Sequence, residues 1–549
     1  MEKRTILAIV LSLAVLMGYQ YIFPPSKPVP STSSVAEKVS RSPVATTNKP
    51  EAATNKDDSL QSPSASNESA VALPIKEALT PVVDGEDITI DSTLYTCVIN
   101  TVGGVMKKFT LKNYRKDIAS GSSRLEMVNV VDPSYFPLSG KIALGDQVFS
   151  DRRFVYQADT KGLEFLQINK EQVTLELRSP QESGMTLVKK YVFYPGEYYF
   201  DLSYELQDRN DAPTILSSTS LVWSHEIFPA AKKPKSYVYR GPQAYVDGKL
   251  FKQSKKQKKI KKMELDGTIN WIGYTTKYFL AAIMPQEQTA VSNVTGVIEK
   301  PKATIVETGM KMGGAGNFRV FIGPKEFDYL KKFNLQLDKS VDFGWFGIIA
   351  RPLVQLLKFF NRYLHNYGLA IILVTILIKL VFYPLSQKSY QSMNKMKAIQ
   401  PKVAKMKEKY KDDKARQQKE MMDLYRTYKV NPFGGCLPIV VQIPVFFGLY
   451  RGLMVAIELR HAPFFWWIQD LAAKDPYYIT PILMGATMFL QQKMSPTTGD
   501  AMQAKMMLFM PLIFTFMFLN FPAGLVLYWL VNNILSIGQQ YMVMKKAEV

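Results

Sequence analysis

Two hydrophobic patterns divide the chain. Between residues 81 and 340, short runs of alternating apolar and polar residues are separated by Gly, Pro, Asn and Asp, as in Tyr198–Leu206. Such alternation predicts closely spaced β-strands in a sandwich. Between residues 365 and 544 the apolar runs are longer. Because roughly 20 apolar helical residues cross a bilayer core of about 30 Å, we predict five spans, over 366–386, 437–457, 478–494, 506–521 and 523–542.

The first 80 residues form two further segments. Residues 1–23 carry Lys3-Arg4 before an uncharged apolar run, which we interpret as a transmembrane anchor. A cleaved signal peptide is the alternative, but the apolar run is longer than usual for one and ends in Tyr-Ile-Phe-Pro-Pro. Residues 24–80 are rich in Pro, Ser, Thr, Ala and Asn, with almost no aromatic residues. We expect them to form a disordered tether, the alternative being a processed pro-segment.

Residues 341–364 connect the two patterns. Large apolar and aromatic residues recur there at helical spacing and are interrupted by Arg351, Lys358 and Arg362. This composition is typical of an amphipathic helix that lies in the membrane interface. Pro352 should kink this helix or begin its second half. A core helix of the β domain is the alternative.

A basic segment, which we place at 387–432, separates the first two predicted spans. Residues 386–436 contain thirteen Lys or Arg and five Asp or Glu. Apolar positions recur three and four residues apart and continue after a turn at 411–414; they are Met396, Ile399, Val403, Met406, Tyr410, Met421, Tyr425 and Tyr428. We expect a helical hairpin with a break near Gln400, since Pro401 suits a helix start. The hairpin either merely connects two spans or docks anionic lipid, ribosomal RNA or a nascent chain.

Charge placement predicts the orientation of the spans. Much of the formal net charge of +21 lies beside them, which favours a membrane over nucleic acid as the anionic partner. A loop as basic as 386–436 stays in the cytoplasm, and Lys3-Arg4 and Lys545-Lys546 agree. The β domain then faces the other compartment, and its basic run at 252–262 is either a solvated loop or a contact for lipid headgroups or an acidic partner. The two cysteines, Cys97 and Cys436, fall on opposite sides and should not pair.

Lys379 is the only charged residue in the first predicted span. A cation in hydrocarbon indicates a functional site, although a lysine this close to the end of a span can also extend to the headgroups. Thr375 lies one turn away on the same face. Further amides fall within or beside the spans, namely Gln442, Gln491, Gln492, Asn532 and Asn533. These groups either line a shared hydrated cavity or make scattered interhelical hydrogen bonds.

Signatures of common enzyme classes are missing from the sequence. It contains no phosphate-binding loop and no G-x-S-x-G elbow, and its three histidines lack metal-ligand spacing. In the β domain nothing in the spacing of Glu226, Asp201 and Glu205 pairs them as in a glycoside hydrolase. The spans also lack the internal repeat common in transporters. The sequence indicates neither an enzyme nor a cofactor; a small-solute transporter or channel remains the alternative.

Five motifs resemble the YidC membrane-protein insertase family: Asn431–Ile439, Gln442–Phe446, Ala472–Tyr478, Gln491–Thr498 and Phe521–Trp529. The resemblance covers essentially the whole chain, in the layout of the Gram-negative form. It implies an anchor helix, a periplasmic β-supersandwich similar to carbohydrate-binding folds, and a five-helix core. The core would enclose a hydrophilic groove open to the cytoplasm and to lipid but closed toward the periplasm.

The resemblance also implies function. The protein would insert, fold and assemble proteins of the inner membrane, alone or with the Sec translocon. Its implied partners are nascent membrane proteins, the Sec translocon and its accessory subunits, the ribosome, the signal recognition machinery and anionic lipids. It would be a multi-pass protein with both termini in the cytoplasm.

The implied site is the groove, with five candidate residues: Lys379, Thr375, Trp529, Gln491 and Gln442. The family has arginine at the position of Lys379. Lysine keeps the positive charge but lacks the bidentate fork, so we expect a general attraction for acidic groups rather than a specific carboxylate clamp.

Overall fold

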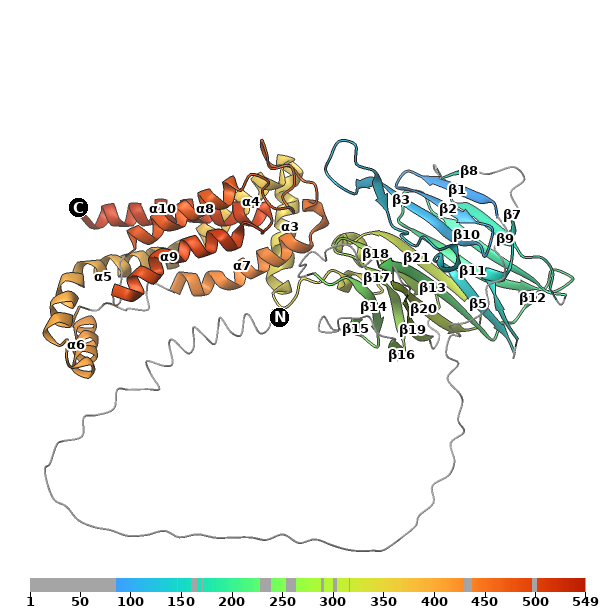
Figure 1. The fold of residues 1–549 in the computed structure, drawn as a ribbon, viewed down its shortest axis with the longest axis horizontal. Helices are drawn as coiled ribbons and strands as arrows, with labels where there is room; N and C mark the ends of the chain where they lie inside the picture. The colour runs from blue at the N-terminus through green and yellow to red at the C-terminus, as the bar shows by residue number, and fades with distance from the viewer. Residues whose placement is uncertain are drawn as a thin grey trace, which may run out of the picture. The chain divides into compact units, whose positions relative to one another are not determined.

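The computed structural model describes residues 85–548, except for 146, 159–164, 169–170, 183, 228–237, 253–262, 288–290, 300–303, 315, 429, 431–436 and 496–500. The predicted anchor at 1–23, the tether at 24–80, nearly all of the basic run at 252–262, and Cys436 lie outside the described residues. The described part consists of a β domain and, after it in sequence, a series of helices (Figure 1).

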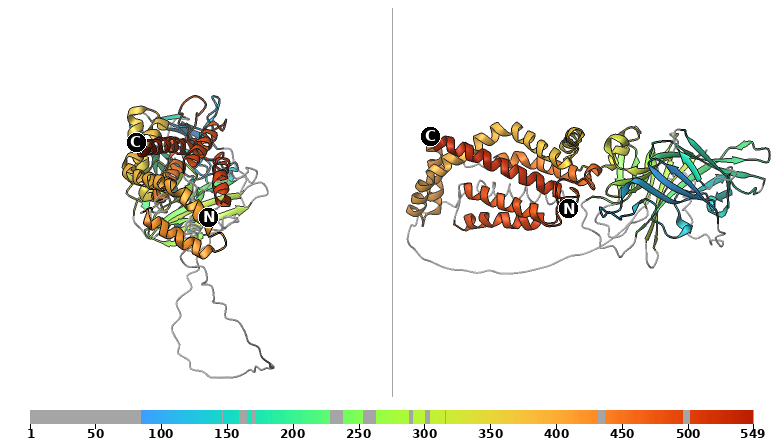
Figure 2. Two further views of the ribbon diagram at one scale, coloured as in Figure 1. Left: turned by 90° about the vertical axis from the view of Figure 1, so that its left-hand side faces the viewer. Right: turned by 90° about the horizontal axis from the view of Figure 1, so that it is seen from above.

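Three sheets build the β domain in the described residues (Figures 1 and 2). A five-stranded sheet has the order β4-β3-β2-β1-β8 and contains β1 (Asp87–Ser92), β2 (Tyr95–Asn100), β3 (Val105–Arg115), β4 (Arg124–Glu126) and β8 (Phe165–Ile168). A six-stranded sheet has the order β16-β19-β20-β13-β5-β6 and contains β5 (Ser139–Leu144), β6 (Gln147–Ser150), β13 (Ser218–Ile227), β16 (Met263–Gly267), β19 (Val291–Glu299) and β20 (Thr304–Gly313).

The third sheet is the largest. Its order is β15-β14-β17-β18-β21-β11-β10-β9-β7, with β12 paired to β11. It contains β7 (Gln157–Ala158), β9 (Val173–Arg178), β10 (Thr186–Phe193), β11 (Tyr199–Gln207), β12 (Pro213–Thr214), β14 (Gly241–Val246), β15 (Lys249–Lys252), β17 (Ile269–Thr275), β18 (Phe279–Pro285) and β21 (Gly316–Pro324). Among the ladders of all three sheets, β1 and β8 pair in parallel and the others are antiparallel.

Burial along the strands explains this layering. Strands β2 and β11 alternate between buried and partly exposed positions, as expected for a sheet with one covered face. Every residue of β14 and β18 is buried, because the large sheet is covered on both faces there. Strands β13 and β20 of the six-stranded sheet pack against β17, β18 and β21. The predicted all-β domain is confirmed.

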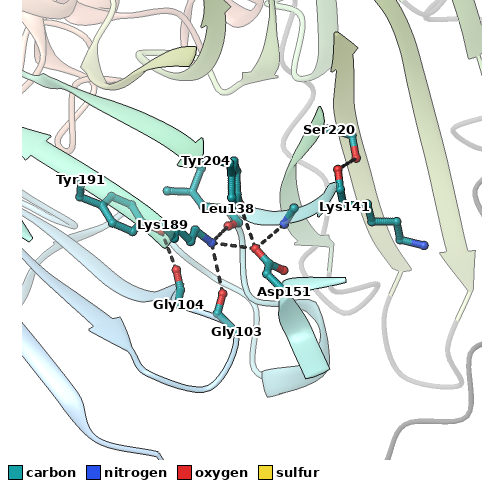
Figure 3. A network of polar contacts seen from close by, with 10 residues as sticks. Gly103, Gly104, Leu138, Lys141, Asp151, Lys189, Tyr191, Tyr204 and Ser220 are labelled. Carbon is teal, nitrogen blue, oxygen red and sulfur yellow. Dashed lines mark hydrogen bonds and ion pairs between the residues drawn. The ribbon is translucent and has the colours of Figure 1, made fainter. Parts of the chain in front are cut away.

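A buried ion pair joins the three sheets (Figure 3). Lys189 on β10 donates to Asp151 Oδ2 (2.8 Å), directly after β6, and neither side chain has exposed surface. The same ammonium donates to the carbonyls of Leu138 (2.7 Å), before β5, and Gly103 (3.2 Å), between β2 and β3. Tyr204 on β11 donates to the carboxylate as well (2.8 Å). Because these groups come from all three sheets, the pair fixes how the sheets pack.

A second buried lysine gives the β domain a pH dependence. Lys325, directly after β21, is buried and donates to Thr275 Oγ1 (3.0 Å) and the Thr276 carbonyl (2.7 Å). Burial lowers its pKa to about 7, although Asp342 acts in the opposite direction. In the unfolded chain this lysine therefore keeps its proton up to about pH 10. In the folded chain it releases the proton near its lowered pKa of about 7.

We therefore expect the free energy of unfolding of the β domain to rise from pH 7 to pH 9.5. The rise is at most about 1.4 kcal/mol per pH unit. In Lys325→Met this rise should be absent. Pulse proteolysis of the full chain in urea, repeated across this pH range, measures both variants. If the free energy of unfolding rose equally with pH in both proteins, Lys325 would not be the source of the rise.

The helices follow the predicted spans closely but not everywhere. They are α2 (Phe327–Lys331), α3 (Gly347–Leu364), α4 (Tyr367–Val381), α5 (Tyr383–Lys409), α6 (Lys414–Thr427), α7 (Leu437–Val455), α8 (Ile479–Met494), α9 (Ala501–Phe518) and α10 (Ala523–Glu548). Helices α8, α9 and α10 lie side by side (Figures 1 and 2). Helix α9 begins five residues before the predicted segment, and α10 extends six residues beyond it.

The span predicted over 366–386 is not one continuous helix in the structure. Helix α4 ends at Val381, and the chain turns by 66° into α5. Pro384 explains the break: in a continuous helix it could not donate to the Leu380 carbonyl, and its ring would clash with that group.

The predicted break near Gln400 is wrong, because α5 runs through Pro401 to Lys409. Met396 and Ile399 are buried just before the proline. Their packing holds the helix in register and offsets the hydrogen bond lost at Pro401.

Residues 403–424 belong to a compact unit separate from the rest of the described chain. Within it, Gln417 Nε2 on α6 donates to the Lys407 carbonyl on α5 (2.8 Å). The Arg416 guanidinium lies 5.2 Å from the centre of the Tyr410 ring. These two contacts join α5 and α6 across the turn at 411–413.

Helix α3 is amphipathic and packs on helices. Its buried residues are Ala350, Val354 and Leu357, and it contacts α4 and α7. Its buried face therefore packs mainly on helices. Its opposite face exposes large apolar residues, including Ile348 (87 % exposed) and Tyr363.

Candidate functional site

The helices α4, α8, α9 and α10 expose apolar side chains. Leu380 on α4, Leu483 on α8 and Phe516 on α9 are all largely exposed. In the part of the chain that the structure describes, no single helix is both long and apolar enough to cross a bilayer. One pair, α4 with α5, meets that test of length and composition together, although it is bent at the break between them.

A polar stripe runs along α10 beneath this apolar exterior. Its members recur at four-residue spacing and so share one face of the helix: Tyr528, Asn532, Ser536 and Gln540. All four are buried or half-buried. The stripe faces α4 and α7, because residues of both helices hydrogen-bond to it.

Lys379 on α4 is bound to this stripe. Its ammonium lies 2.6 Å from Ser536 Oγ, and that hydroxyl donates to the Asn532 carbonyl one turn earlier (2.7 Å). The lysine side chain is only half-buried. Its ammonium is thus held between α4 and α10, and part of the residue stays accessible.

Gln442 on α7 reaches the same stripe. Its Nε2 donates to Asn532 Oδ1 (2.7 Å) and lies 3.4 Å from the Tyr528 hydroxyl. Lys379 and Gln442 are therefore linked through Asn532, although they are far apart in sequence. These are two of the five candidate residues, and the structure brings them together.

The other three candidates lie apart from this network. Thr375 is buried, and its hydroxyl donates to the Ile371 carbonyl of its own helix (2.6 Å). Trp529 is half-buried in an aromatic cluster with Phe446 (ring centres 4.7 Å apart), Phe514 and Phe518. Gln491 is half-buried near the end of α8, where its carbonyl accepts the Ser495 hydroxyl.

The segment 457–478 anchors α4 and α10. Asn366 caps α4 by accepting from the backbone of Gly368 (2.8 Å) and Leu369, and its Nδ2 donates to the Phe464 carbonyl. At the start of α10, Ala523 N donates to Ala473 O (2.7 Å) and Gly524 N to Leu471 O (2.9 Å). Both helices that carry the site are thus fixed by the same segment.

Gly524 lets α10 approach α4 closely. A Cβ at this position would lie 3.2 Å from Ile371 Cδ1 on α4 and 3.2 Å from the Leu471 carbonyl oxygen. A larger residue would push the helices apart. The close approach at this end keeps Ser536 within reach of Lys379.

Sequence reasoning missed Ser536 and Tyr528. The signal was present, because Tyr528, Asn532, Ser536 and Gln540 repeat every four residues. Serine and tyrosine are common within apolar runs, so composition alone does not mark either residue as part of a site. Only the helical period singles them out.

The described residues offer no metal site, since no group of three or more His, Cys, Asp or Glu side chains converges in them. The acidic residues of the β domain are also engaged separately. Asp201 accepts two hydrogen bonds from Arg319 (2.7 and 2.9 Å), Glu226 accepts from Val131 N, and Glu205 accepts from Gln207.

Comparison with known proteins gives matches along nearly the whole chain. The family described as "60Kd inner membrane protein" matches residues 359–548, and "YidC periplasmic domain" matches residues 87–356. The chain is 45% identical to the membrane protein insertase YidC of Syntrophus aciditrophicus (strain SB), over 100% of both chains. It is 40% identical to that of Geotalea uraniireducens (strain Rf4), over 99% of both chains. Among solved structures it is similar to an active YidC insertase with its first transmembrane domain resolved. That match has 18% identity and a TM-score of 0.39, and it covers 84% of this chain and 93% of that one.

Proposed function

The chain belongs to the YidC family of membrane protein insertases, and on this premise we propose that it inserts, folds and assembles proteins of the inner membrane. The observation that carries the proposal is a half-buried lysine, Lys379, whose ammonium is bonded to a polar stripe among helices with apolar exteriors. The relatives give no support to a small-solute transporter or channel.

The physical problem for an insertase is the polar part of its client. A hydrophilic tail that enters hydrocarbon loses water from its side chains and backbone, and each unpaired polar group is unfavourable by several kcal/mol. A polar groove that reaches part-way across the bilayer shortens the apolar distance. We infer that Lys379, Asn532 and Gln442 line this groove and replace part of the lost hydration.

The client's own hydrophobic segment supplies the driving force. Each CH₂ group that moves from water into lipid contributes about 0.8 kcal/mol. The segment would leave the groove sideways along apolar and aromatic residues, and Trp529 with its neighbours Phe446 and Phe518 offers such a surface. Thr375 and Gln491 stay candidates for client contact. The chain's residues need no nucleotide or cofactor for these steps.

Topology follows from charge. We propose that residues 81–340 lie in the periplasm, that 341–364 lie in the interface, and that 365–544 form a core of five spans. The basic hairpin at 387–432 and both termini would face the cytoplasm, and residues 1–23 would add an anchor. The exposed apolar face of α3, with Ile348 and Tyr363, suits the interfacial position.

The partners follow from the same surfaces. Nascent membrane proteins are the substrates. The hairpin, with exposed Lys405 and Lys409, would receive clients or contact the ribosome, the signal recognition machinery or anionic headgroups. The Sec translocon and its accessory subunits would work with this chain on clients that need both.

Reconstitution tests the proposal. Liposomes that contain only this chain should insert a single-span client, and empty liposomes should not. Deletion of residues 30–324 should leave at least half of the rate, because the groove lies outside the deletion. This variant retains Glu326 and Asp328, which hold Lys358 on α3 (3.4 and 2.9 Å). Loss of insertion in this variant, despite intact core helices, would place the activity in the β domain instead.

A further inference from the structure

The ammonium of Lys379 has few protein contacts. In the described residues its one hydrogen bond is to Ser536 Oγ (2.6 Å), and it forms no ion pair with a carboxylate. An ammonium carries three N–H donors, so two remain for other groups. A lysine with no acceptor beside it could extend its flexible stem toward the headgroups instead.

Ser536 is arranged as an acceptor for this ammonium. The side chain is buried, and its one hydrogen goes to the Asn532 carbonyl (2.7 Å). The lone pairs of the hydroxyl oxygen are therefore left to accept, and Lys379 uses one of them.

The arrangement continues to α7. Asn532 uses its backbone carbonyl for Ser536 and its side-chain oxygen for Gln442 (2.7 Å). Three helices thus meet at one chain of hydrogen bonds. A chain of this kind restricts rotation of each member, because a shift of one side chain breaks a bond to the next.

We propose that Ser536 is the positioning residue for Lys379. It holds the ammonium at the stripe on α10, so that the two free N–H donors point to a carboxylate of the client's tail. This inference rests on the proposed function of the groove. A single ammonium offers no bidentate fork, so its selectivity for a carboxylate depends on a fixed position.

Removal of the hydroxyl should therefore weaken recognition of acidic tails. In Ser536→Ala we expect the initial rate of insertion of a client with one Asp in its tail to fall three- to tenfold, about the effect of one hydrogen bond. The same client with Asn in place of Asp should change less than twofold. Ser536→Thr retains the hydroxyl and should recover most of the rate.

The decisive experiment is a double-mutant cycle in liposomes that contain the full chain. Ser536→Ala is compared in the wild-type background and in Lys379→Met, with the Asp-tail client. A positioning role requires that Ser536→Ala has less than a twofold effect once the ammonium is gone. Thr515→Val is the matched control, since Thr515 makes the same type of bond to a carbonyl one turn earlier (Pro511 O, 2.8 Å) on a different helix, α9.

Each outcome decides one point. Equal losses in both backgrounds would show a purely structural role and overturn the inference, as would an unaffected rate in Ser536→Ala. Failure of the wild-type chain to insert either client would instead overturn the proposed function. Resistance of each variant to proteolysis shows that it has folded.

Discussion

Lys379→Glu is expected to lower the rate of insertion of a client with an acidic tail by more than about tenfold. The substitution places a carboxylate where the ammonium now lies, and like charges at close range in a poorly solvated site repel by more than 1.4 kcal/mol. Ser536 would also lose its partner, because its hydrogen already serves the Asn532 carbonyl. Lys379→Arg should retain the wild-type rate, and neutral Lys379→Ala should have a milder effect than the reversal.

The measurement uses two clients that differ only in one tail residue, Asp or Asn. With the Asn client the loss in Lys379→Glu should shrink to a fewfold. Lys388→Glu is the control, since Lys388 is an exposed lysine just beyond the bend at Phe382. If Lys379→Glu inserted the Asp client as fast as the wild type, electrostatic attraction would not be the mechanism.

Lys189→Met is expected to destabilise the β domain by about 3–5 kcal/mol. The substitution leaves the Asp151 carboxylate buried without its cation, and the carbonyls of Leu138 and Gly103 lose their donor (Figure 3). A buried pair is weak evidence of net stability, but removal of one partner is strongly destabilising. The double variant Asp151→Asn/Lys189→Met should therefore be less destabilised than the sum of the single variants.

Pulse proteolysis in urea, applied to the full chain in detergent, measures this loss. Lys190→Met is the matched control because Lys190 is the next residue on β10 and is exposed. We expect its effect to stay within about 0.5 kcal/mol. Similar midpoints for the two variants would contradict the role assigned to the buried pair.

Much of the fold could be predicted from local pattern. Period-two alternation located strand β11, and apolar runs located α7 and α8 within two residues. These features are encoded in neighbouring residues, which is why a sequence reveals them. Two prolines show where local pattern fails: Pro384 interrupts the helix within the span predicted over 366–386, and Pro401 lies inside a helix that we predicted to break there. The outcome depends on packing around each proline, which spacing does not contain.

The candidate site was only partly predictable. Lys379 stands out because a charge within an apolar run is rare. Its partner Ser536 lies 157 positions away on another helix, and no local signal connects the two. The packing of α4 against α10 belongs to the tertiary structure, which the local sequence pattern does not reveal. For Thr375 the local pattern suggested a partner that the structure does not show. Thr375 shares a helical face with Lys379, yet its hydroxyl donates to the Ile371 carbonyl of its own helix.

The proposed groove requires that water reaches Lys379 within the membrane. In a chain with Cys97 and Cys436 replaced by serine, a cysteine at 379 is treated with a membrane-impermeant thiol reagent from the cytoplasmic side, and a cysteine at 380 serves as the control. Leu380 is the next residue of α4 and is 66 % exposed on the apolar exterior. We expect the cysteine at 379 to react and the one at 380 to stay unmodified. A cysteine at 379 as unreactive as its neighbour would contradict a hydrated groove.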